Sequence, residues 1–276
     1  MSAAPPVEPA RLALIAGRGR LPALVAEAAP GALVCEMEGA ASEAPGERLA
    51  WRVERLGTLL ATLREREVEA VCLCGALHRP KLDLAAVDGT TLPLLGRILA
   101  ALPRGDDATL RAAVAIFEEA GLAVLAPETI RPDLLPPAGV LEGEVSSAAR
   151  RDVERAAEIL HALGAADVGQ ACVVAQGQCL AVEALPGTDH MLSVVGALGS
   201  RRPDPGRGRG VLVKAPKRGQ ERRVDLPAIG PETVRGAAAA GLSGVAIEAG
   251  GVLVLDLEAT RREAREAELF LWVREG

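Results

Sequence analysis

The first half of the chain alternates short apolar runs with amphipathic segments, and this alternation restricts the possible folds more than any other feature. Strands are expected at residues 11–17, 32–38, 69–77 and 122–126, and helices at 21–29, 56–68, 90–102 and 106–121. Strands that alternate with helices in this way form a parallel sheet with crossover helices. We therefore expect a Rossmann-like α/β domain, whose ligands would bind beyond the carboxyl ends of its strands.

A Pro-rich stretch at residues 131–140 marks the expected end of this domain, because it lacks hydrophobic periodicity. The predicted domains are residues 1–135 and 136–276. The second domain is expected to contain a helix at 146–164, strand pairs within 171–185 and 245–257, and helices at 188–199 and 231–242. Gln-Gly-Gln and Gly-Gly turns inside the two strand pairs are typical of hairpins. These elements predict an α+β domain with a mixed sheet.

Aromatic side chains are scarce, which excludes some classes of partner. The chain has no Tyr, two Phe and two Trp, and its net charge is −6. Nucleic-acid modules that stack bases on aromatic rings are therefore not expected. The negative charge also argues against a general binder of polyanions.

The five cysteines lie inside apolar runs at no zinc-ligand spacing, so they are expected to be small buried hydrophobic residues. Their odd number, without a signal peptide, indicates a reducing cytosol. No apolar run reaches the ~18 residues that a membrane span needs. We expect a cytoplasmic protein, and contact with a membrane surface stays open.

Two glycines follow the first predicted strand. Gly17 and Gly19 precede a helix that begins near Pro22, and such glycines let backbone N–H groups approach a phosphate. A nicotinamide-binding motif would place a third glycine at Pro22, although Glu36 and Glu38 lie near the position of a ribose-binding acid. A tight strand-to-helix turn explains the same glycines without a ligand.

Two other places in the first domain could contact a ligand. Residues 75–82 place His78 and two cations after a predicted buried strand, at the sheet edge where ligands bind. Asp106 and Asp107 begin a predicted helix. Both acids favour a helix start by capping and through the helix dipole, so that role explains them without a ligand.

In the second domain, a strand end and a helix start place Glu183 near Asp189, and the two carboxylates could reach a common point. Helix capping by Thr188 or Asp189 is the alternative explanation.

A cationic segment, residues 214–225, follows a strand-like run. Five Lys or Arg side chains lie within ten residues and are followed by Asp225. Lys supplies a point charge and Arg a planar fork, which together are typical of phosphate sites. Asp225 could hold Mg²⁺ or position a water molecule. A solvated charged loop is the competing interpretation.

Seven motifs, spread over nearly the whole chain, resemble one family. They are LIAGRGRLP (14–22), GALHRP (75–80), GDD (105–107), DVGQACVV (167–174), AVEALPGTDHML (181–192), GVLVKAPKRGQERRVDLPAIGPETV (210–234) and GLSGVAIEAGGVLVLD (241–256). In order and spacing they resemble the LpxI-type UDP-2,3-diacylglucosamine pyrophosphatases of lipid A biosynthesis. The resemblance implies a Mg²⁺-dependent hydrolase that forms UMP and 2,3-diacylglucosamine 1-phosphate (lipid X), with water attacking the β-phosphorus.

The resemblance also implies which residues act. Asp225 is the expected catalytic residue and Mg²⁺ ligand, with Asp189 and Glu183 as further ligands. The implied substrate-binding residues are Gly17, Gly19, Leu77, Asp106, Asp107, Gln170, Thr188, Asp189, Lys214, Lys217 and Gln220. Two domains with the substrate between them, a homodimer and contact with the inner membrane are implied as well. Arg18 departs from the family pattern, since it interrupts a loop of three glycines.

Three other functions fit parts of the pattern. A non-catalytic module that binds a sugar nucleotide or a phospholipid would share the cations and glycines. A nicotinamide oxidoreductase could use the first domain, although the third glycine is missing. A protein-interaction scaffold would leave the cationic segment exposed and empty.

Overall fold

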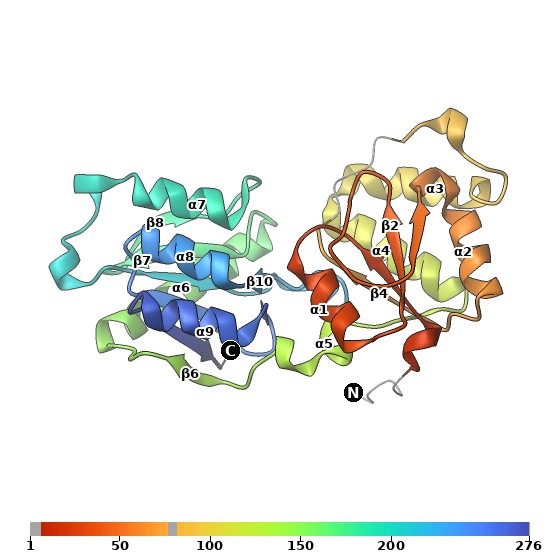
Figure 1. The fold of residues 1–276 in the computed structure, drawn as a ribbon. Coiled ribbons are helices and arrows are strands. Elements are labelled where there is room, and N and C mark those ends of the chain that lie inside the picture. Colours follow the sequence, from red (N-terminus) through yellow and green to blue (C-terminus); the bar gives the residue numbers. More distant parts are fainter. Residues whose placement is uncertain (1–6, 77–81, 276) are drawn as a thin grey trace. The chain divides into compact units, whose positions relative to one another are not determined.

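The computed structural model describes residues 7–76 and 82–275. These residues form two compact units (Figure 1). The first unit runs to Pro132 and also includes Glu221–Asp225, and the second comprises Asp133–Gln220 and the chain from Leu226 onward. The end of the cationic segment therefore packs with the first unit, although it lies between strands of the second in the sequence.

The first unit is built on a five-stranded parallel sheet with the order β3-β2-β1-β4-β5. Its strands are β1 (Leu12–Ala16), β2 (Leu33–Met37), β3 (Arg48–Trp51), β4 (Ala70–Cys74) and β5 (Ala123–Val124). The predicted Rossmann-like parallel sheet is thus confirmed. β1 and β4 are completely buried at the centre, where the strand order changes direction and α/β proteins bind their ligands.

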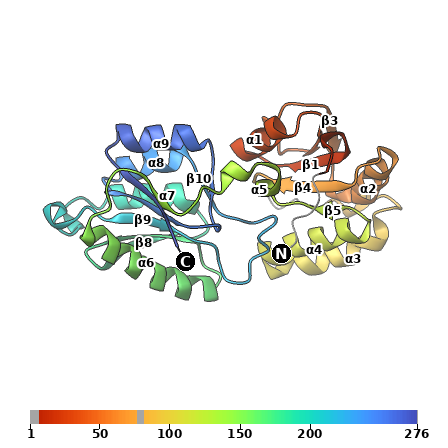
Figure 2. The same ribbon diagram turned by 90° about the horizontal axis from the view of Figure 1, so that it is seen from below.

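Helices cover both faces of this sheet (Figure 2). They are α1 (Arg20–Ala28), α2 (Leu56–Glu65), α3 (Leu92–Ala101), α4 (Asp106–Glu119) and the short α5 (Pro127–Ile130). Apolar residues of α2, α3 and α4 form one core with alternate residues of the strands, whereas α1 and α5 contact each other on the opposite face.

The second unit contains a six-stranded sheet with the order β6-β13-β11-β9-β7-β8. The prediction that this sheet is mixed is confirmed. Its strands are β6 (Gly139–Glu142), β7 (Ala171–Ala175), β8 (Gln178–Val182), β9 (Val211–Lys214), β11 (Gly244–Glu248) and β13 (Phe270–Arg274). β9, β11 and β13 are parallel to one another, and β6, β7 and β8 pair antiparallel to their neighbours.

Four helices pack on the two faces of this sheet. They are α6 (Ser147–Ala165), α7 (Gly187–Gly196), α8 (Pro231–Ala239) and α9 (Leu257–Glu266). Buried residues of α6 form a core with one face, and those of α7, α8 and α9 form a larger core with the other. No helix in the described ranges is long and apolar enough to cross a membrane.

One of the two predicted hairpins is confirmed and the other is wrong. β7 and β8 pair antiparallel around the Gln176–Gly177 turn. Residues 245–257, in contrast, do not fold back on themselves, because β11 lies between β9 and β13. The strand after its turn, β12 (Leu253–Val254), instead pairs with β10 (Ala228–Ile229) in a separate two-stranded sheet. The continuous burial of β11 is typical of an interior parallel strand rather than of a hairpin.

Candidate functional site

A polar cluster in the second unit joins the end of β9 to the first turn of α7. The Lys214 ammonium donates a hydrogen bond to Thr188 Oγ1 at 2.7 Å, and the Thr188 hydroxyl donates to Glu183 Oε1 at 2.5 Å. Lys214 Nζ also lies 3.7 Å from that carboxylate oxygen. The side chains of Lys214 and Glu183 are only 9% and 12% exposed, so the charged pair is largely shielded from water.

Two glutamines, Gln170 and Gln220, extend this group farther along the cationic segment. Glu183 Oε2 accepts a hydrogen bond from the backbone N–H of Gln170 at 3.1 Å, and Gln170 Oε1 accepts one from Gln220 Nε2 at 3.4 Å. Gln220 Oε1 accepts a hydrogen bond from the backbone N–H of Lys217 at 3.1 Å. These residues form the Lys214 cluster: Gln170, Glu183, Thr188, Lys214, Lys217 and Gln220. Five predicted substrate-binding residues, distant in the sequence, are therefore linked with one predicted metal ligand.

Strand register explains why these residues meet. The antiparallel pairing of β7 with β9 places Ala171 opposite Lys214, so Gln170 lies beside the end of β9. Gly169 allows β8 to approach, since a Cβ there would lie 2.1 Å from the backbone oxygen of Glu183. Gly187 then starts α7 with a φ of +86°, a conformation that favours glycine.

Burial and nearby acids shift the pKa of Lys214 in opposite directions. Burial lowers the pKa of its ammonium below the ordinary value, and the carboxylates of Glu183 and Asp189 oppose that shift. The ammonium is therefore a partly desolvated cation beside the start of a helix. Such a cation attracts an anion more strongly than a fully hydrated lysine does.

The Lys217 ammonium pairs with a carboxylate outside the Lys214 cluster. The ammonium lies 2.6 Å from Asp167 Oδ1, and Asp167 is an exposed residue in the turn after α6. Asp167 was not predicted as a partner from the sequence, although it lies in the DVGQACVV motif (167–174). Asp167 has a left-handed φ of +53°, which is found in tight turns. Asp adopts this conformation more readily than most residues, and that tendency is the only local sequence signal for this position.

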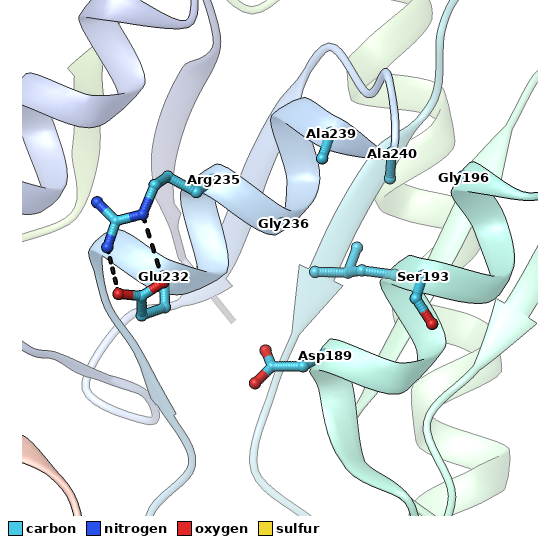
Figure 3. Close-up of a pocket in the computed structure, with 9 residues that line it drawn as sticks. Asp189, Ser193, Gly196, Glu232, Arg235, Gly236, Ala239 and Ala240 are labelled. Carbon is cyan, nitrogen blue, oxygen red and sulfur yellow. Dashed lines mark hydrogen bonds and ion pairs between the residues drawn. The ribbon is translucent and has the colours of Figure 1, made fainter.

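Asp189 lies apart from the hydrogen-bonded cluster, at one end of a groove between α7 and α8 (Figure 3). The groove has a volume of about 610 Å³. It is lined by Asp189, Leu192, Ser193, Gly196, Glu232, Arg235, Gly236, Ala239 and Ala240. Arg235 pairs with Glu232 and Glu263 at its edge. Small residues keep the groove open, because a Cβ at Gly236 would meet the Leu192 side chain at 3.0 Å.

The end of the cationic segment is anchored in the first unit. The Arg223 guanidinium pairs with Glu221 at 2.9 Å and with Glu118 of α4 at 2.7 Å. Val224 packs against the apolar core of the first unit. Both acids raise the pKa of Arg223, so its charge is already balanced by protein carboxylates. Arg223 therefore holds this segment in place rather than offering a phosphate contact.

Asp225, the predicted catalytic residue, ends this anchored turn. Its backbone N–H donates to the carbonyl oxygen of Glu221 at 3.1 Å, and the residue is half-buried. Asp107 supports the same turn, because its Oδ1 accepts a hydrogen bond from the backbone N–H of Glu221 at 3.3 Å. Asp107 Oδ2 accepts a second hydrogen bond, from Arg111 Nε at 2.8 Å.

The glycine loop of the first unit packs against the loop after β4. The backbone N–H of Gly17 donates to the carbonyl oxygen of Cys74, and Arg18 and Ala76 exchange two backbone hydrogen bonds of 2.9 Å. A Cβ at Gly17 would lie 2.6 Å from the Ala76 oxygen. Gly17 is thus required by the contact between the two loops. Gly19 has a φ of +92° and caps α1, with open space where its Cβ would be.

Some predicted positions of the first domain cannot be located. Leu77 and the charged residues of 78–81 lie outside the described residues, as does the side chain of Asp106. Glu36, considered as a ribose-binding acid, instead accepts hydrogen bonds from the backbone of Ser42 and from Arg48. The Glu36 carboxylate is therefore already bound by Ser42 and Arg48 of its own unit.

The described residues contain no group of three or more His, Cys, Asp or Glu side chains that could hold a metal. Glu183 is poorly suited as a ligand, since both its oxygens already accept hydrogen bonds and the Lys214 ammonium lies 3.7 Å from Oε1. Asp189 and Asp225 are single carboxylates, in the second and first unit respectively. Mg²⁺ is often bound by one or two carboxylates together with substrate phosphates, and either aspartate fits such a role.

Comparison with known proteins gives matches over both units. The model of the LpxI N-terminal domain matches residues 11–134, and that of the LpxI C-terminal domain matches residues 137–272. The chain is also similar to a UDP-2,3-diacylglucosamine pyrophosphatase LpxI of Caulobacter vibrioides. The two are 38% identical over an alignment of 276 positions, which covers 95% of this chain and 96% of the relative.

Proposed function

The chain belongs to the LpxI family, and on this basis we propose that it hydrolyses UDP-2,3-diacylglucosamine in lipid A biosynthesis. The products are UMP and 2,3-diacylglucosamine 1-phosphate, and Mg²⁺ is the proposed cofactor. The reaction breaks the phosphoanhydride bond between the two phosphorus atoms and adds a water oxygen to one of them.

The Lys214 cluster is the observation that most supports this function. A diphosphate diester carries two negative charges that repel an incoming water nucleophile. A shielded ammonium beside the start of α7 offers a cation and backbone N–H groups to such an anion. These features fit a phosphate ligand better than they fit an empty charged loop, because five of the six cluster residues lie outside the cationic segment or are shielded from water.

In this proposal Asp225 orients the attacking water, directly or as a Mg²⁺ ligand. The anchored turn of Glu221–Asp225 supports such a role, because a catalytic carboxylate must be held in a fixed place. Bound Mg²⁺ would neutralise charge that develops on the phosphate oxygens. Asp189 is the second candidate ligand, and Glu183 is less suited to that role because its oxygens accept hydrogen bonds beside the Lys214 ammonium.

The diacyl part of the substrate needs an apolar surface. The groove between α7 and α8 begins at Asp189 and continues over Leu192 and the small residues of both helices (Figure 3). We propose that it receives part of an acyl chain. A substrate that resides in a bilayer would bring the protein to the inner membrane surface as a peripheral protein. A homodimer remains part of the proposal on the strength of the family resemblance.

Incubation of the purified protein with UDP-2,3-diacylglucosamine and Mg²⁺ tests the function. We expect UMP to appear, and we expect a metal chelator to stop its release. A protein that binds the substrate but releases no UMP at any Mg²⁺ concentration would instead be a non-catalytic sugar-nucleotide or phospholipid-binding module.

A further inference from the structure

We propose that Glu183 is a positioning residue for this hydrolysis, which acts through Thr188 to hold the Lys214 ammonium at the start of α7. The inference rests on the proposed function and goes beyond it in one respect. It gives Glu183 a role in which it binds neither metal nor substrate. Lys214, held by this relay, is then the side chain that meets the diphosphate.

The proton of Thr188 decides the order of the relay. A threonine hydroxyl has one proton, and here it is donated to Glu183 Oε1 at 2.5 Å. Thr188 Oγ1 at the same time accepts a hydrogen bond from Lys214. A phosphate oxygen that carries negative charge can only accept hydrogen bonds. The Thr188 side chain therefore has no proton left for the substrate, although the family resemblance implies that it binds there.

Lys214, unlike Thr188, has more than one proton to donate. An ammonium has three N–H groups, and Thr188 takes one of them. The ammonium thus keeps donors for an anion while the hydrogen bond to Thr188 fixes its position. β9 is completely buried up to this residue, so the lysine stem has little freedom of its own.

Glu183 is itself held firmly, as a positioning residue must be. Its Oε2 accepts the hydrogen bond from the Gln170 backbone, and its backbone N–H donates to the Ala171 oxygen at 2.8 Å. The residue is only 9% exposed. A buried ammonium without a nearby acid would be costly, and Glu183 offsets that cost as the acid in contact with it. Asp189 is the other acid that acts on Lys214.

A double-mutant cycle tests the relay. Glu183→Gln removes the negative charge and keeps the shape, and we expect kcat/KM to fall about 10- to 100-fold, the usual scale for a hydrogen bond to a charged group. In a Lys214→Met background, Glu183→Gln should change kcat/KM by less than about twofold, because the residue it positions is gone. Independent, multiplying effects of the two substitutions would overturn the proposal.

The Mg²⁺ dependence separates this role from metal binding. We expect the Mg²⁺ concentration for half-maximal activity to be the same in Glu183→Gln as in the unmodified protein. A strongly raised requirement, with activity restored by excess Mg²⁺, would make Glu183 a metal ligand and overturn the relay. Thr188→Ser keeps the hydroxyl and should lose less activity than Thr188→Val, which should match Glu183→Gln.

Asp152→Asn is the matched control for lost stability. Asp152 is another buried acid of the second unit, and it accepts hydrogen bonds from the backbone of Gln176 and Gly177 at the opposite end of β7. We expect this variant to unfold at a lower temperature and to keep its kcat/KM. Equal losses of activity in Asp152→Asn and Glu183→Gln would reduce Glu183 to a structural role. An unmodified protein that releases no UMP would refute the proposed function itself, so the two failures are distinguishable.

Discussion

Arg223 and Glu118 form an ion pair of 2.7 Å that ties the turn before Asp225 to helix α4 of the first unit. The two residues are separated by 105 positions in the sequence. The same turn is held by the hydrogen bond from the Glu221 backbone to Asp107. A catalytic carboxylate that follows a short turn depends on such anchors for its position.

Arg223→Gln should therefore lower kcat by about 10-fold and leave KM nearly unchanged, because a small displacement of a catalytic group lowers the rate of the chemical step. Steady-state kinetics with the diacyl substrate would measure both constants. Glu118→Gln, which removes only one of the two ion pairs of Arg223, should show a smaller effect of the same kind. A large rise in KM with an unchanged kcat would mean that Arg223 binds the substrate phosphates.

The groove between α7 and α8 can be filled without disturbing a core. Ala239 is exposed on α8 and lines the groove, so Ala239→Phe would occupy space there. We expect a KM about 10-fold higher for the diacyl substrate and little change for an analogue without acyl chains. Ala162→Phe, at an exposed position of α6 on the other face of the sheet, is the control. Equal KM values for Ala239→Phe and the control would exclude the groove as an acyl-chain site.

The contact between the two loops of the first unit predicts a cost in stability. A Cβ at Gly17 would lie 2.6 Å from the Ala76 oxygen, which is backbone and cannot simply move aside. Gly17→Ala should lower the free energy of unfolding by roughly 1–3 kcal/mol, the usual cost of overpacking. Denaturant titration would measure it. Gly89→Ala, where nothing lies within 4 Å of the new Cβ, should be neutral or slightly stabilising.

Glu128 predicts a pH dependence of stability. Burial raises the pKa of its carboxyl above the ordinary value, and among the described residues its Oε2 has no hydrogen-bond partner. Because the folded state binds this proton more tightly, the contribution of Glu128 to stability is most favourable below its unfolded pKa of about 4.3. That contribution is lost as the pH rises from the unfolded-state pKa to the raised folded-state pKa of Glu128.

Glu128→Gln should consequently raise the free energy of unfolding at neutral pH and change it little below about pH 4. Denaturant titrations of both proteins across this range would give the difference. A variant that is less stable at neutral pH would show that the ionised carboxylate contributes a favourable interaction in the folded state.

Local patterns predicted much of the fold, and the failures have physical causes. β1 and β4 are continuous buried runs, which a sequence pattern shows directly. β3 was missed because Arg48–Trp51 is half-exposed at the edge of its sheet and resembles a loop. β12 was assigned to a hairpin with β11, since the Gly250–Gly251 turn gives no sign that the strand after it leaves the sheet.

The site could be predicted as a set of residues but not as an arrangement. Motifs identified Gln170, Thr188 and Lys214. The register of β7 with β9 brings Gln170 beside Lys214, and a hydrogen bond joins Thr188 to Lys214. The hydrogen bond that occupies the Thr188 proton depends on tertiary structure, so no spacing in the sequence could have suggested the positioning role that we propose for Glu183.

The turnover of Asp225→Ala tests the central claim most directly, namely that this carboxylate takes part in hydrolysis of the diphosphate. Substrate binding should be measured by calorimetry and UMP release by a single-turnover assay with saturating Mg²⁺. We predict a folded protein that binds the substrate normally and releases UMP at least ~100-fold more slowly, the scale expected for a group that acts in the transition state. Release of UMP at a nearly unchanged rate would contradict the account.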